Sequence, residues 1–438
     1  MVSTNYQYDI VIAGGGMVGL SLALMLVQEM PALQVAIVER AAVTHQPAVT
    51  GNSFDSRSTA VSAGSVELLD ALEVWPALAR HATAIRTVDV SDRGHLGRTR
   101  YSVANARAQH MLGALGFVVD NAHLGQALLA AVKQTGRITQ LCPATVTAIA
   151  PKAQATEITV EFEQEQQASQ TLRAQLLIIA DGAESGLRKQ LGIGADINDY
   201  GQHAVIANVH HSKPHQCVAY ERFTEQGPMA LLPRGGGERG CQSALVWTRP
   251  ESQLQATLAL SDEHCLAQIQ STFGYRLGSF QKISTRHHYP LKLSLAKEQV
   301  RSGLALVGNA AHFLHPVAGQ GFNLAVRDCA QLTAALAEAH KQNTWLGSLP
   351  TLQAYMAKQS RDQFATTMLS HGFNSLFSNN RKPLQLLRNL GLLGLQAAPA
   401  AQKDFFDQMM GRGMARAELN LLQRYLLRKQ AQAELAEV

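Results

Sequence analysis

The chain has 438 residues, of which 46% are hydrophobic and 16% are charged, and its formal net charge is +5. This length allows two or three domains with a large core, and the composition is that of an ordered globular protein rather than a disordered or fibrous one. The mild positive charge forms no basic stripe interleaved with aromatic residues, so we do not expect nucleic-acid binding.

The five cysteines are scattered along the chain and form no CxxC pair; they are Cys142, Cys217, Cys241, Cys265 and Cys329. This pattern is typical of reduced thiols in a reducing compartment, and we expect no bound metal. The sequence begins without a signal-peptide pattern and has no run of about 18 apolar residues that could cross a membrane. We therefore expect a cytoplasmic protein, whose charge is compatible with peripheral association with the inner membrane.

The first 40 residues hold the clearest motif. Residues 9–13 are almost continuously apolar and predict a buried parallel strand. Three glycines follow, and a helix comes next. Gly14 permits a tight turn, Gly16 lets the backbone approach a pyrophosphate, and Gly19 lets the helix pack close to the strand. This arrangement predicts a dinucleotide site at the positive end of the helix.

Glu39 follows the second predicted strand, residues 35–38, and lies about 20 residues beyond Gly19. A carboxylate at that place can accept hydrogen bonds from the ribose hydroxyls of an adenosine. We count Glu39 and its neighbour Arg40 among the candidate binding residues. The alternative is a glycine turn that binds nothing, and the acidic residue at this spacing argues against it.

Two later strands are predicted to end at the same edge. Residues 175–180 form a buried strand that stops at Asp181, with Ser185 and Arg188 one turn into the next helix. These residues could organise a phosphate-bearing ligand, or Asp181 could simply cap a helix. Residues 304–307 form a third buried strand that stops at Gly308-Asn309. The carboxyl ends of parallel strands meet at one sheet edge, so we expect a site assembled there.

Two further features stay ambiguous on residues alone. A glycine-rich loop, residues 316–321, leads into a long helix, and it suits either a ligand or a plain connection into a core helix. Arg57 could neutralise a pyrophosphate or pair with Asp55 on the surface. A second complete glycine fingerprint is missing from the sequence, so we expect no separate nicotinamide domain.

The elements predict an α/β fold: a Rossmann-like dinucleotide domain, an inserted antiparallel-sheet substrate domain and a helical C-terminal region. We assign residues 1–75, 105–195 and 285–345 to the first domain, 76–104 and 196–284 to the sheet domain, and 346–438 to the helical region. Residues 384–395 are strongly apolar and flanked by Arg381, Lys382 and Arg388. That segment predicts an amphipathic helix that could dock on a membrane or on a partner, or pack as an ordinary helix.

Three motifs follow one another along the chain: the glycine loop with Glu39, the segment from Asp181 to Arg188, and Gly308-Asn309 with the loop at residues 316–321. In this order they resemble those of the FAD-dependent aromatic hydroxylases with the para-hydroxybenzoate hydroxylase fold. Residues 54–60, 88–95, 221–224 and 319–324, with Arg327-Asp328, resemble the ubiquinone-biosynthesis branch of that family. Most of the fold family has Asp where Asn309 stands. An amide still donates and accepts hydrogen bonds, so the predicted ribityl contact survives.

The resemblance implies a role for each candidate residue. The predicted FAD contacts are Gly14, Gly16, Gly19, Glu39, Arg40, Arg57, Val146, Asp181, Asn309, Gly321, Phe322 and Asn323. Pro316, Gly319, Gln320 and Gly321 would form the flavin-facing catalytic loop. We assign no side-chain base, and Tyr220, His312 and His95 are only weak candidates.

The resemblance also implies a reaction: hydroxylation of the ring of a polyprenylated phenol, expected to be 2-polyprenyl-6-methoxyphenol, in ubiquinone biosynthesis. FAD would be the cofactor, NADH or NADPH the reductant and O₂ the co-substrate, with oxygen transfer through a C4a-hydroperoxyflavin. Another ring position, a non-prenylated phenol and a non-catalytic flavoprotein of a biosynthetic complex stay open as alternatives. Other ubiquinone-biosynthesis proteins and the membrane surface are the expected partners, and the oligomeric state is open.

Overall fold

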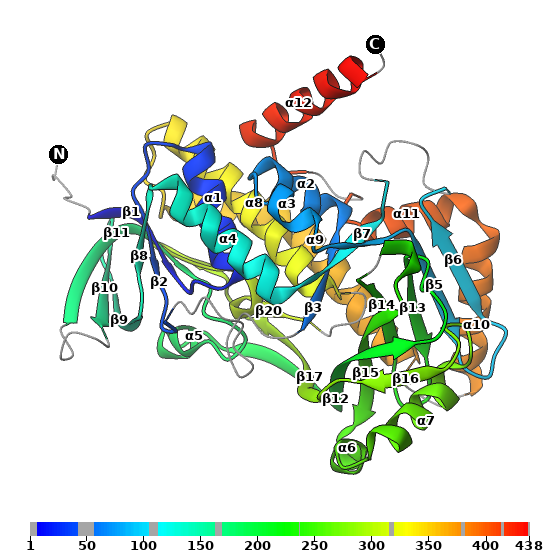
Figure 1. Cartoon of the computed structure of the whole chain (residues 1–438). Coiled ribbons are helices and arrows are strands. Elements are labelled where there is room, and N and C mark those ends of the chain that lie inside the picture. Colours follow the sequence, from blue (N-terminus) through cyan, green and yellow to red (C-terminus); the bar gives the residue numbers. More distant parts are fainter. Residues whose placement is uncertain are drawn as a thin grey trace.

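Five parallel strands run through one half of the molecule, on the left in Figure 1. Their order is β19 (Leu304–Leu306), β11 (Ser169–Ile179), β1 (Tyr8–Ala13), β2 (Val35–Val38) and β8 (Ile138–Leu141). The structure is a computed structural model, and it describes residues 7–42, 57–104, 113–162, 169–235, 237–314, 319–377, 382–412 and 416–436. The three buried strands expected from the sequence are therefore neighbours in one sheet.

The register of this sheet sets the place of the site. Ala13 pairs with Ile179, and Ile179 pairs with Leu306, so the three strands end level with one another. Among the described residues, the sheet is completed by antiparallel strands: β18 (Val300–Arg301) on β19, and the ribbon of β9 (Ala144–Pro151) and β10 (Thr156–Phe162) on β11.

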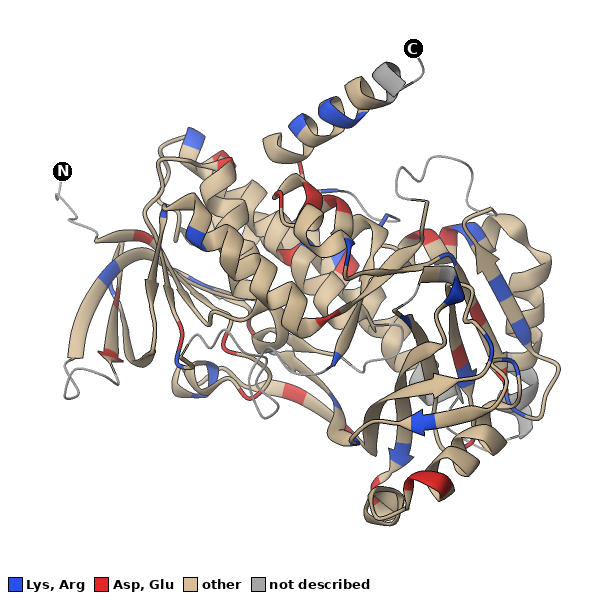
Figure 2. Ribbon diagram, viewed as in Figure 1, with Lys and Arg blue, Asp and Glu red and all other residues tan. Residues whose placement is uncertain are grey.

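Helices cover one face of the parallel sheet. They are α1 (Met17–Glu29), α4 (Asn121–Thr135) and α8 (Gln320–Lys341), which lie side by side in Figure 1. Figure 2 shows α1 almost free of charged positions, and its one charge, Glu29, is its last residue. An all-apolar helix of this kind is stable only when protein surrounds it, and residues 19–27 of α1 are all buried.

A second sheet forms the other half of the molecule. Its strands, in order, are β20 (His312–Phe313), β17 (His287–Ala296), β12 (Ala195–His211), β15 (Gln242–Pro250), β14 (Met229–Arg234), β13 (Val218–Phe223), β5 (Thr87–Asp92) and β6 (Arg98–Ser102), with β16 (Phe280–Ile283) on β12. The pairs are antiparallel, as expected, except that β5 runs parallel to β13. Helices α6 (Glu251–Leu258) and α7 (Asp262–Phe273) pack on one face.

A small sheet joins the two halves: β3 (Ser58–Ser62), β7 (Gly116–Asp120) and β4 (Thr83–Ile85). The remaining helices are α2 (Ala63–Ala71), α3 (Trp75–Ala79), α5 (Gly186–Gln190), α9 (Leu349–Phe377), α10 (Lys382–Ala397), α11 (Pro399–Met409) and α12 (Asn420–Ala436). The described part of the chain beyond residue 349 is almost wholly helical, as predicted, and α12 projects from the body in Figure 1.

Two segments pair differently from the division that we expected. β17 and β20 lie within residues 285–345, yet both belong to the second sheet. β4 lies within residues 76–104, yet it pairs with β7 of the small sheet. Short strands take their partners from tertiary packing, which local composition does not encode. The domain boundaries themselves stay a prediction.

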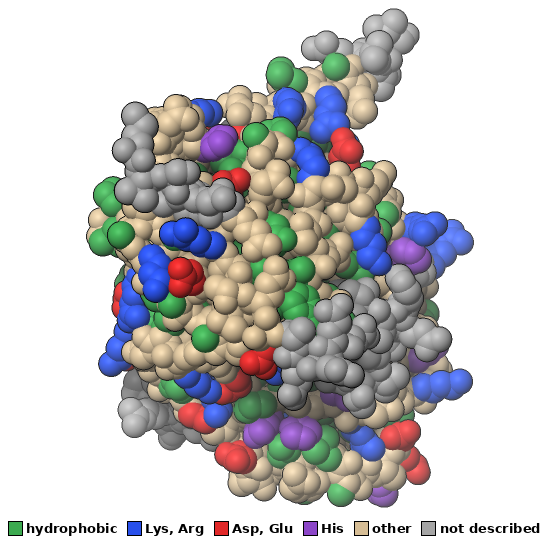
Figure 3. Space-filling view, turned by 90° about the vertical axis from the view of Figure 1, so that its left-hand side faces the viewer, with side chains coloured by type: hydrophobic (Ala, Val, Ile, Leu, Met, Phe, Trp, Pro, Cys, Tyr) green, Lys and Arg blue, Asp and Glu red, His purple; other side chains and the backbone are tan. Residues whose placement is uncertain are grey.

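The surface agrees with a protein of mixed charge. On the face shown in Figure 3, Lys and Arg side chains lie scattered among acidic and hydrophobic ones. Among the helices that the structure describes, none is both long and apolar enough to span a membrane. All five cysteines are free thiols, and three of them are buried.

One ion pair holds the second sheet against the small sheet. Arg234, at the end of β14, donates two hydrogen bonds to Asp120, at the end of β7, over 3.0 and 2.6 Å. Asp120 also accepts a hydrogen bond from Ser58. Burial alone would raise the pKa of Asp120, but the hydrogen bonds from Arg234 and Ser58 lower it below its usual value. The pair is therefore a stabilising contact between the two halves.

Replacing Arg234 by Met should lower the free energy of unfolding by about 1–2 kcal/mol near neutral pH. The folded-state pKa of Asp120 is depressed, so the pair's stabilisation is present above about pH 4 and is lost as the pH falls through the folded-state value. Denaturant unfolding of both proteins at several pH values should show the difference shrinking in acid. Lys297→Met, which removes an exposed partner of Asp196, is the matched control and should change little; an equal loss in both variants would contradict this account.

Candidate functional site

The loop after β1 requires glycine for steric reasons. Gly14 has φ +119°, and a Cβ there would lie 2.4 Å from the carbonyl oxygen of Ala180. A Cβ at Gly19 would lie 2.0 Å from the carbonyl oxygen of Gly14. Gly16 precedes α1 in extended backbone, and no acidic side chain occupies the first turn. The free N–H groups and the positive end of α1 therefore remain available to an anion.

Glu39 lies directly against this loop. Its carboxylate accepts a hydrogen bond from the backbone N–H of Gly15 over 2.6 Å and one from Ala41 over 2.8 Å. Each carboxylate oxygen can accept more than one hydrogen bond, so capacity remains for a ligand hydroxyl. Arg40, the next residue, is exposed.

Val146 lies at the same corner of the sheet. The carbonyl oxygen of Glu39 accepts a hydrogen bond from the N–H of Ala144, the first residue of β9, over 2.8 Å. Val146 is two residues further along β9 and is buried. The structure thus brings Val146, Glu39 and the glycine loop together at one end of the site.

The segment after β11 shows the helix-capping role that the sequence left open, and the ligand role stays a prediction. Asp181 is exposed, and its Oδ2 accepts a 3.3 Å hydrogen bond from the N–H of Leu187. Ser185 caps the short helix α5 by accepting from the N–H of Arg188. Arg188 is buried and donates from Nη1 to the carbonyl oxygen of Ala310 over 2.9 Å. Its guanidinium ties the ends of β11 and β19 together.

The turn after β19 lies close to the first loop. Gly308 has φ +60°, and a Cβ there would come within 3.1 Å of the Val18 side chain at the start of α1. Asn309, the next residue, is exposed in a 3₁₀ turn, Gly308–Ala310. Its amide is therefore accessible to a ligand at the edge where the three strands end.

The start of α8 is held by its own residues. Gly319 has φ +62°, and the side chain of Gln320 donates to the carbonyl oxygen of Met409 over 3.1 Å. The Asn323 amide accepts from the N–H of Ser62 and donates to the carbonyl oxygens of Ala60 and Gly319, each over 2.8 Å. Its side chain therefore fastens α8 to β3, and only its backbone remains for a ligand.

Gly321 has open space where a Cβ would be, and Phe322 is partly buried. Pro316 lies outside the described residues. The first turn of α8 carries no acidic residue, so its positive end is not neutralised from within the helix.

Arg57 lies between the two halves of the molecule. Its guanidinium carbon is 4.4 Å from the centre of the Tyr289 ring on β17, a cation–π distance. The carbonyl oxygen of Arg57 accepts a hydrogen bond from Asn121. Asp55, the surface partner considered from the sequence, lies outside the described residues.

A buried polar pair, to which the sequence pointed only weakly, lies beside this site. His312 Nε2 is hydrogen-bonded to Asp328 of α8, and Gln363 of α9 donates to the other oxygen of Asp328 over 3.1 Å. Both His312 and Asp328 are almost fully buried. The pair ties the segment after β19 to α8 and α9. Among the described residues, no group of three or more His, Cys, Asp and Glu side chains is placed to hold a metal ion.

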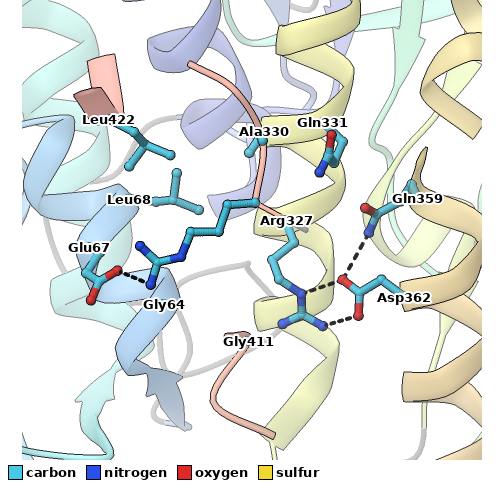
Figure 4. Close-up of a pocket in the computed structure, with 12 residues that line it drawn as sticks. Gly64, Glu67, Leu68, Arg327, Ala330, Gln331, Gln359, Asp362, Gly411 and Leu422 are labelled. Atoms are coloured by element: carbon cyan, nitrogen blue, oxygen red, sulfur yellow. Dashed lines mark hydrogen bonds and ion pairs between the residues drawn. The ribbon is translucent and has the colours of Figure 1, made fainter. Parts of the chain in front are cut away.

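A separate small pocket is lined by residues of α2, α8, α9 and the C-terminal segment, and Figure 4 shows it. Ion pairs close it: Arg327 with Asp362, and Glu67 with Arg412 and Arg416. None of the residues predicted to bind a cofactor lines this pocket. We interpret it as a packing contact between α2, α8, α9 and the C-terminal segment.

Comparison with known proteins identifies the chain. The FAD binding domain family matches residues 7–369. The chain is 32% identical over 409 residues to ubiquinone hydroxylase UbiL of Rhodospirillum rubrum, covering 93% of this chain and 91% of that protein. It is equally identical to 3-demethoxyubiquinol 3-hydroxylase of Escherichia coli, covering 93% of this chain and all of that protein. The chain belongs to the FAD-dependent aromatic hydroxylases of ubiquinone biosynthesis.

The fold comparison agrees. The crystal structure of p-nitrophenol 4-monooxygenase PnpA from Pseudomonas putida superposes with a TM-score of 0.74 at 16% identity, covering 93% of this chain and 99% of that chain. At this identity the likeness shows the fold alone. The predicted α/β architecture of this hydroxylase family is thereby confirmed.

The residues present suit FAD, the cofactor of this family. Gly14 and Gly19 let the loop backbone pack closely against Ala180 and against itself, and the first turn of α1 carries no carboxylate that would compete with a phosphate. Glu39 lies against the glycine loop, and the exposed Asn309 offers an amide just after the end of β19.

Replacing Gly19 by Ala should weaken FAD binding by at least about tenfold, because the new Cβ forces the loop backbone away from its place. Fluorescence titration of the FAD-free protein with FAD would measure the dissociation constant. Gly394→Ala, in α10 with nothing near its added Cβ, is the control and should bind FAD as the original chain does. Unchanged affinity in the Gly19 variant would show that the cofactor does not use this loop.

Proposed function

We propose that this hydroxylase acts on the aromatic ring of a polyprenylated phenol, with NADH or NADPH as the reductant and O₂ as the co-substrate. The observation that carries the proposal is the 32% identity to two ubiquinone-ring hydroxylases over nearly the full length of each chain. The level ends of β1, β11 and β19 support it, because they bring the turns that follow the three strands to one edge of the sheet.

Each end of the cofactor has its own group of residues in this proposal. Gly14, Gly16, Gly19 and Arg57 would hold the pyrophosphate, Glu39 and Arg40 the adenosine ribose, and Val146 the adenine. Asp181 would lie near the pyrophosphate and Asn309 near the ribityl chain. Residues 316–323, which include Pro316, Gly319, Gln320, Gly321, Phe322 and Asn323, would border the isoalloxazine ring.

When bound, FAD supplies electron transfer from NAD(P)H and the activation of O₂. The chain's own contribution is placement and electrostatics. The positive end of α8 would stabilise negative charge on the flavin ring, and Asn323 holds that helix end against β3. The apolar contact between β3 and the second sheet would keep water from the reacting groups.

We propose 2-polyprenyl-6-methoxyphenol as the substrate. A different ring position is the second candidate, favoured by the equal identity to a relative named as a 3-hydroxylase of demethoxyubiquinol. The position of the added oxygen on the product ring separates the two.

The test uses the purified FAD-bound protein and a short-tailed 2-prenyl-6-methoxyphenol. We expect NAD(P)H oxidation to rise when the phenol is added, and the product to carry one more oxygen on its ring by mass spectrometry. Repeating the assay with NADH and with NADPH would identify the reductant. A protein that binds FAD but neither responds to the phenol nor oxygenates it would contradict the substrate proposal.

We also propose that an anionic membrane surface contacts the hairpin turn of β5 and β6 together with α10, because the substrate's prenyl tail resides in lipid. Leu96 in the turn, and Leu390 and Leu393 on α10, are 89%, 58% and 44% exposed. The N–H of Gly97 donates to Asn389 over 2.7 Å, so the turn lies against α10. Arg93 and Arg98 flank Leu96 in the sequence, and Figure 2 shows basic positions along β6.

Changing both Leu390 and Leu393 to Ser should weaken sedimentation with anionic phosphatidylglycerol vesicles by at least about tenfold, because the changes remove several carbon groups and each CH₂ buried in the membrane contributes about 0.8 kcal/mol. Hydroxylation of a short-tailed phenol should stay unchanged. Leu427→Ser on α12, an equally exposed leucine elsewhere, is the control. Vesicle binding that survives the double change would rule out this surface.

A further inference from the structure

Glu221 is the unusual residue of the second sheet. It lies in the middle of β13, its side chain is partly buried, and among the described residues it has no hydrogen bond or ion pair. Buried or half-buried carboxylates normally have a partner, because an isolated charge loses its hydration. The sequence showed Glu221 only as part of a family-like stretch and gave it no role.

The neighbours of Glu221 are apolar on every side within the sheet. Val90 of β5 is its partner on one side and Ala230 of β14 on the other. Residues two apart on a strand share a face, so Ala219 and Phe223 flank it along β13, and both are buried. The surroundings desolvate the carboxylate and raise the pKa of Glu221 to about 7.

The face that carries Glu221 is turned toward the cofactor half at its Ala219 end, while at the other end Phe223 and Val90 pack against Leu392 of α10. Ala219 and Leu232, on this face, pack with Ala60 of β3 and Val118 of β7. Gly319, at the start of α8, lies against the same Ala60: a Cβ at Gly319 would be 3.1 Å from the Ala60 Cβ. The opposite face is covered by α7, where Arg222 donates to the carbonyl oxygen of Thr272 over 2.9 Å.

Among the described residues, the charged groups that β5 and β14 place on this face are already paired. At one end Asp92 of β5 lies 3.1 Å from His95 and accepts from Asn389 of α10. At the other end Arg234 of β14 is bound to Asp120 of β7. Asp89, although on β5, points to the α7 face, where Arg276 binds it. In the part of the chain that the structure describes, no cation therefore neutralises Glu221. Desolvation of its carboxylate is what raises its pKa.

We propose that Glu221 is a catalytic residue: its carboxylate binds the phenolic hydroxyl of the ring substrate and accepts its proton. In this step the phenol O–H bond breaks, a carboxyl O–H bond forms, and the oxygen electron pair is left to donate into the ring. A ring with phenolate character is the stronger nucleophile toward an electrophilic oxygen. This inference rests on the proposed function and names the proton acceptor that the sequence left unassigned.

The test compares the original FAD-bound enzyme with Glu221→Gln, which keeps the size of the side chain and removes its ionisation. The original enzyme should show kcat rising with pH through about 7, since only the ionised carboxylate can accept a proton. Glu221→Gln should lower kcat about 100-fold, because general-base catalysis typically accelerates a reaction by about that factor. The rise of kcat with pH near 7 (the pH limb) should also disappear in this variant. Phenol binding, measured by quenching of the flavin fluorescence, should change far less than kcat.

Glu225→Gln, an exposed glutamate in the turn after β13, is the matched control and should keep the original rate and profile. Glu221→Asp keeps a carboxylate and should recover part of the rate together with the pH limb. FAD content and melting temperature show whether each variant is folded. If Glu221→Gln does not fold, the pH dependence of kcat in Glu221→Asp is the test. The proposal is overturned if kcat of Glu221→Asp rises over the same pH range as that of the original enzyme.

The inference is wrong if Glu221→Gln hydroxylates the phenol within about twofold of the original rate, or keeps the pH limb at a lower rate. The proposed function fails separately, if the original enzyme oxygenates no phenol at any pH.

Discussion

Parallel hydrogen bonding between β19, β11 and β1 is the constraint on which the whole site depends. The three strands lie some 170 and 125 residues apart in the chain, and their register makes them end level. Each strand then delivers its own turn to one edge: the glycine loop, the Asp181 segment and the Gly308-Asn309 turn. Arg188 binds two of these turns together through Ala310. A cofactor site of this kind can form only after the sheet has paired, so the site and the fold are stabilised together.

The second requirement is that the substrate sheet stays close to that edge. Three contacts of different chemistry maintain the approach: the Arg234–Asp120 ion pair, the Arg57–Tyr289 cation–π contact and the apolar packing around Ala219. The Asn323 amide then fixes the start of α8 to β3 at the same junction. In the proposed function this junction would hold the reaction among apolar side chains, and Glu221, which has no hydrogen-bond or ion-pair partner among the described residues, has a raised pKa because burial desolvates its carboxylate.

Local pattern predicted a large part of this structure. The strand, glycine loop and helix at residues 8–29 could be predicted from the sequence alone. A buried apolar run predicts the strand and the helix, and the glycines stand where a Cβ would not fit. The pairing of β17 with β12 and the Arg188–Ala310 bond could not, because each depends on residues more than 80 positions away. Glu221 was not predicted as a functional residue for the same reason. In the sequence it looks like any glutamate on a half-exposed strand, and only the folded sheet surrounds its carboxylate with apolar side chains.

We propose that the chain inserts one oxygen atom from O₂ into a prenylated phenol ring at this junction. The most direct measurement is the isotope composition of the product formed by the FAD-bound enzyme under isotopically labelled dioxygen in ordinary water, with NAD(P)H and a short-tailed phenol. The account predicts that the new ring hydroxyl carries the label and that its formation consumes NAD(P)H. A product whose new oxygen comes from water, or a phenol recovered unchanged while NAD(P)H is consumed, would contradict it.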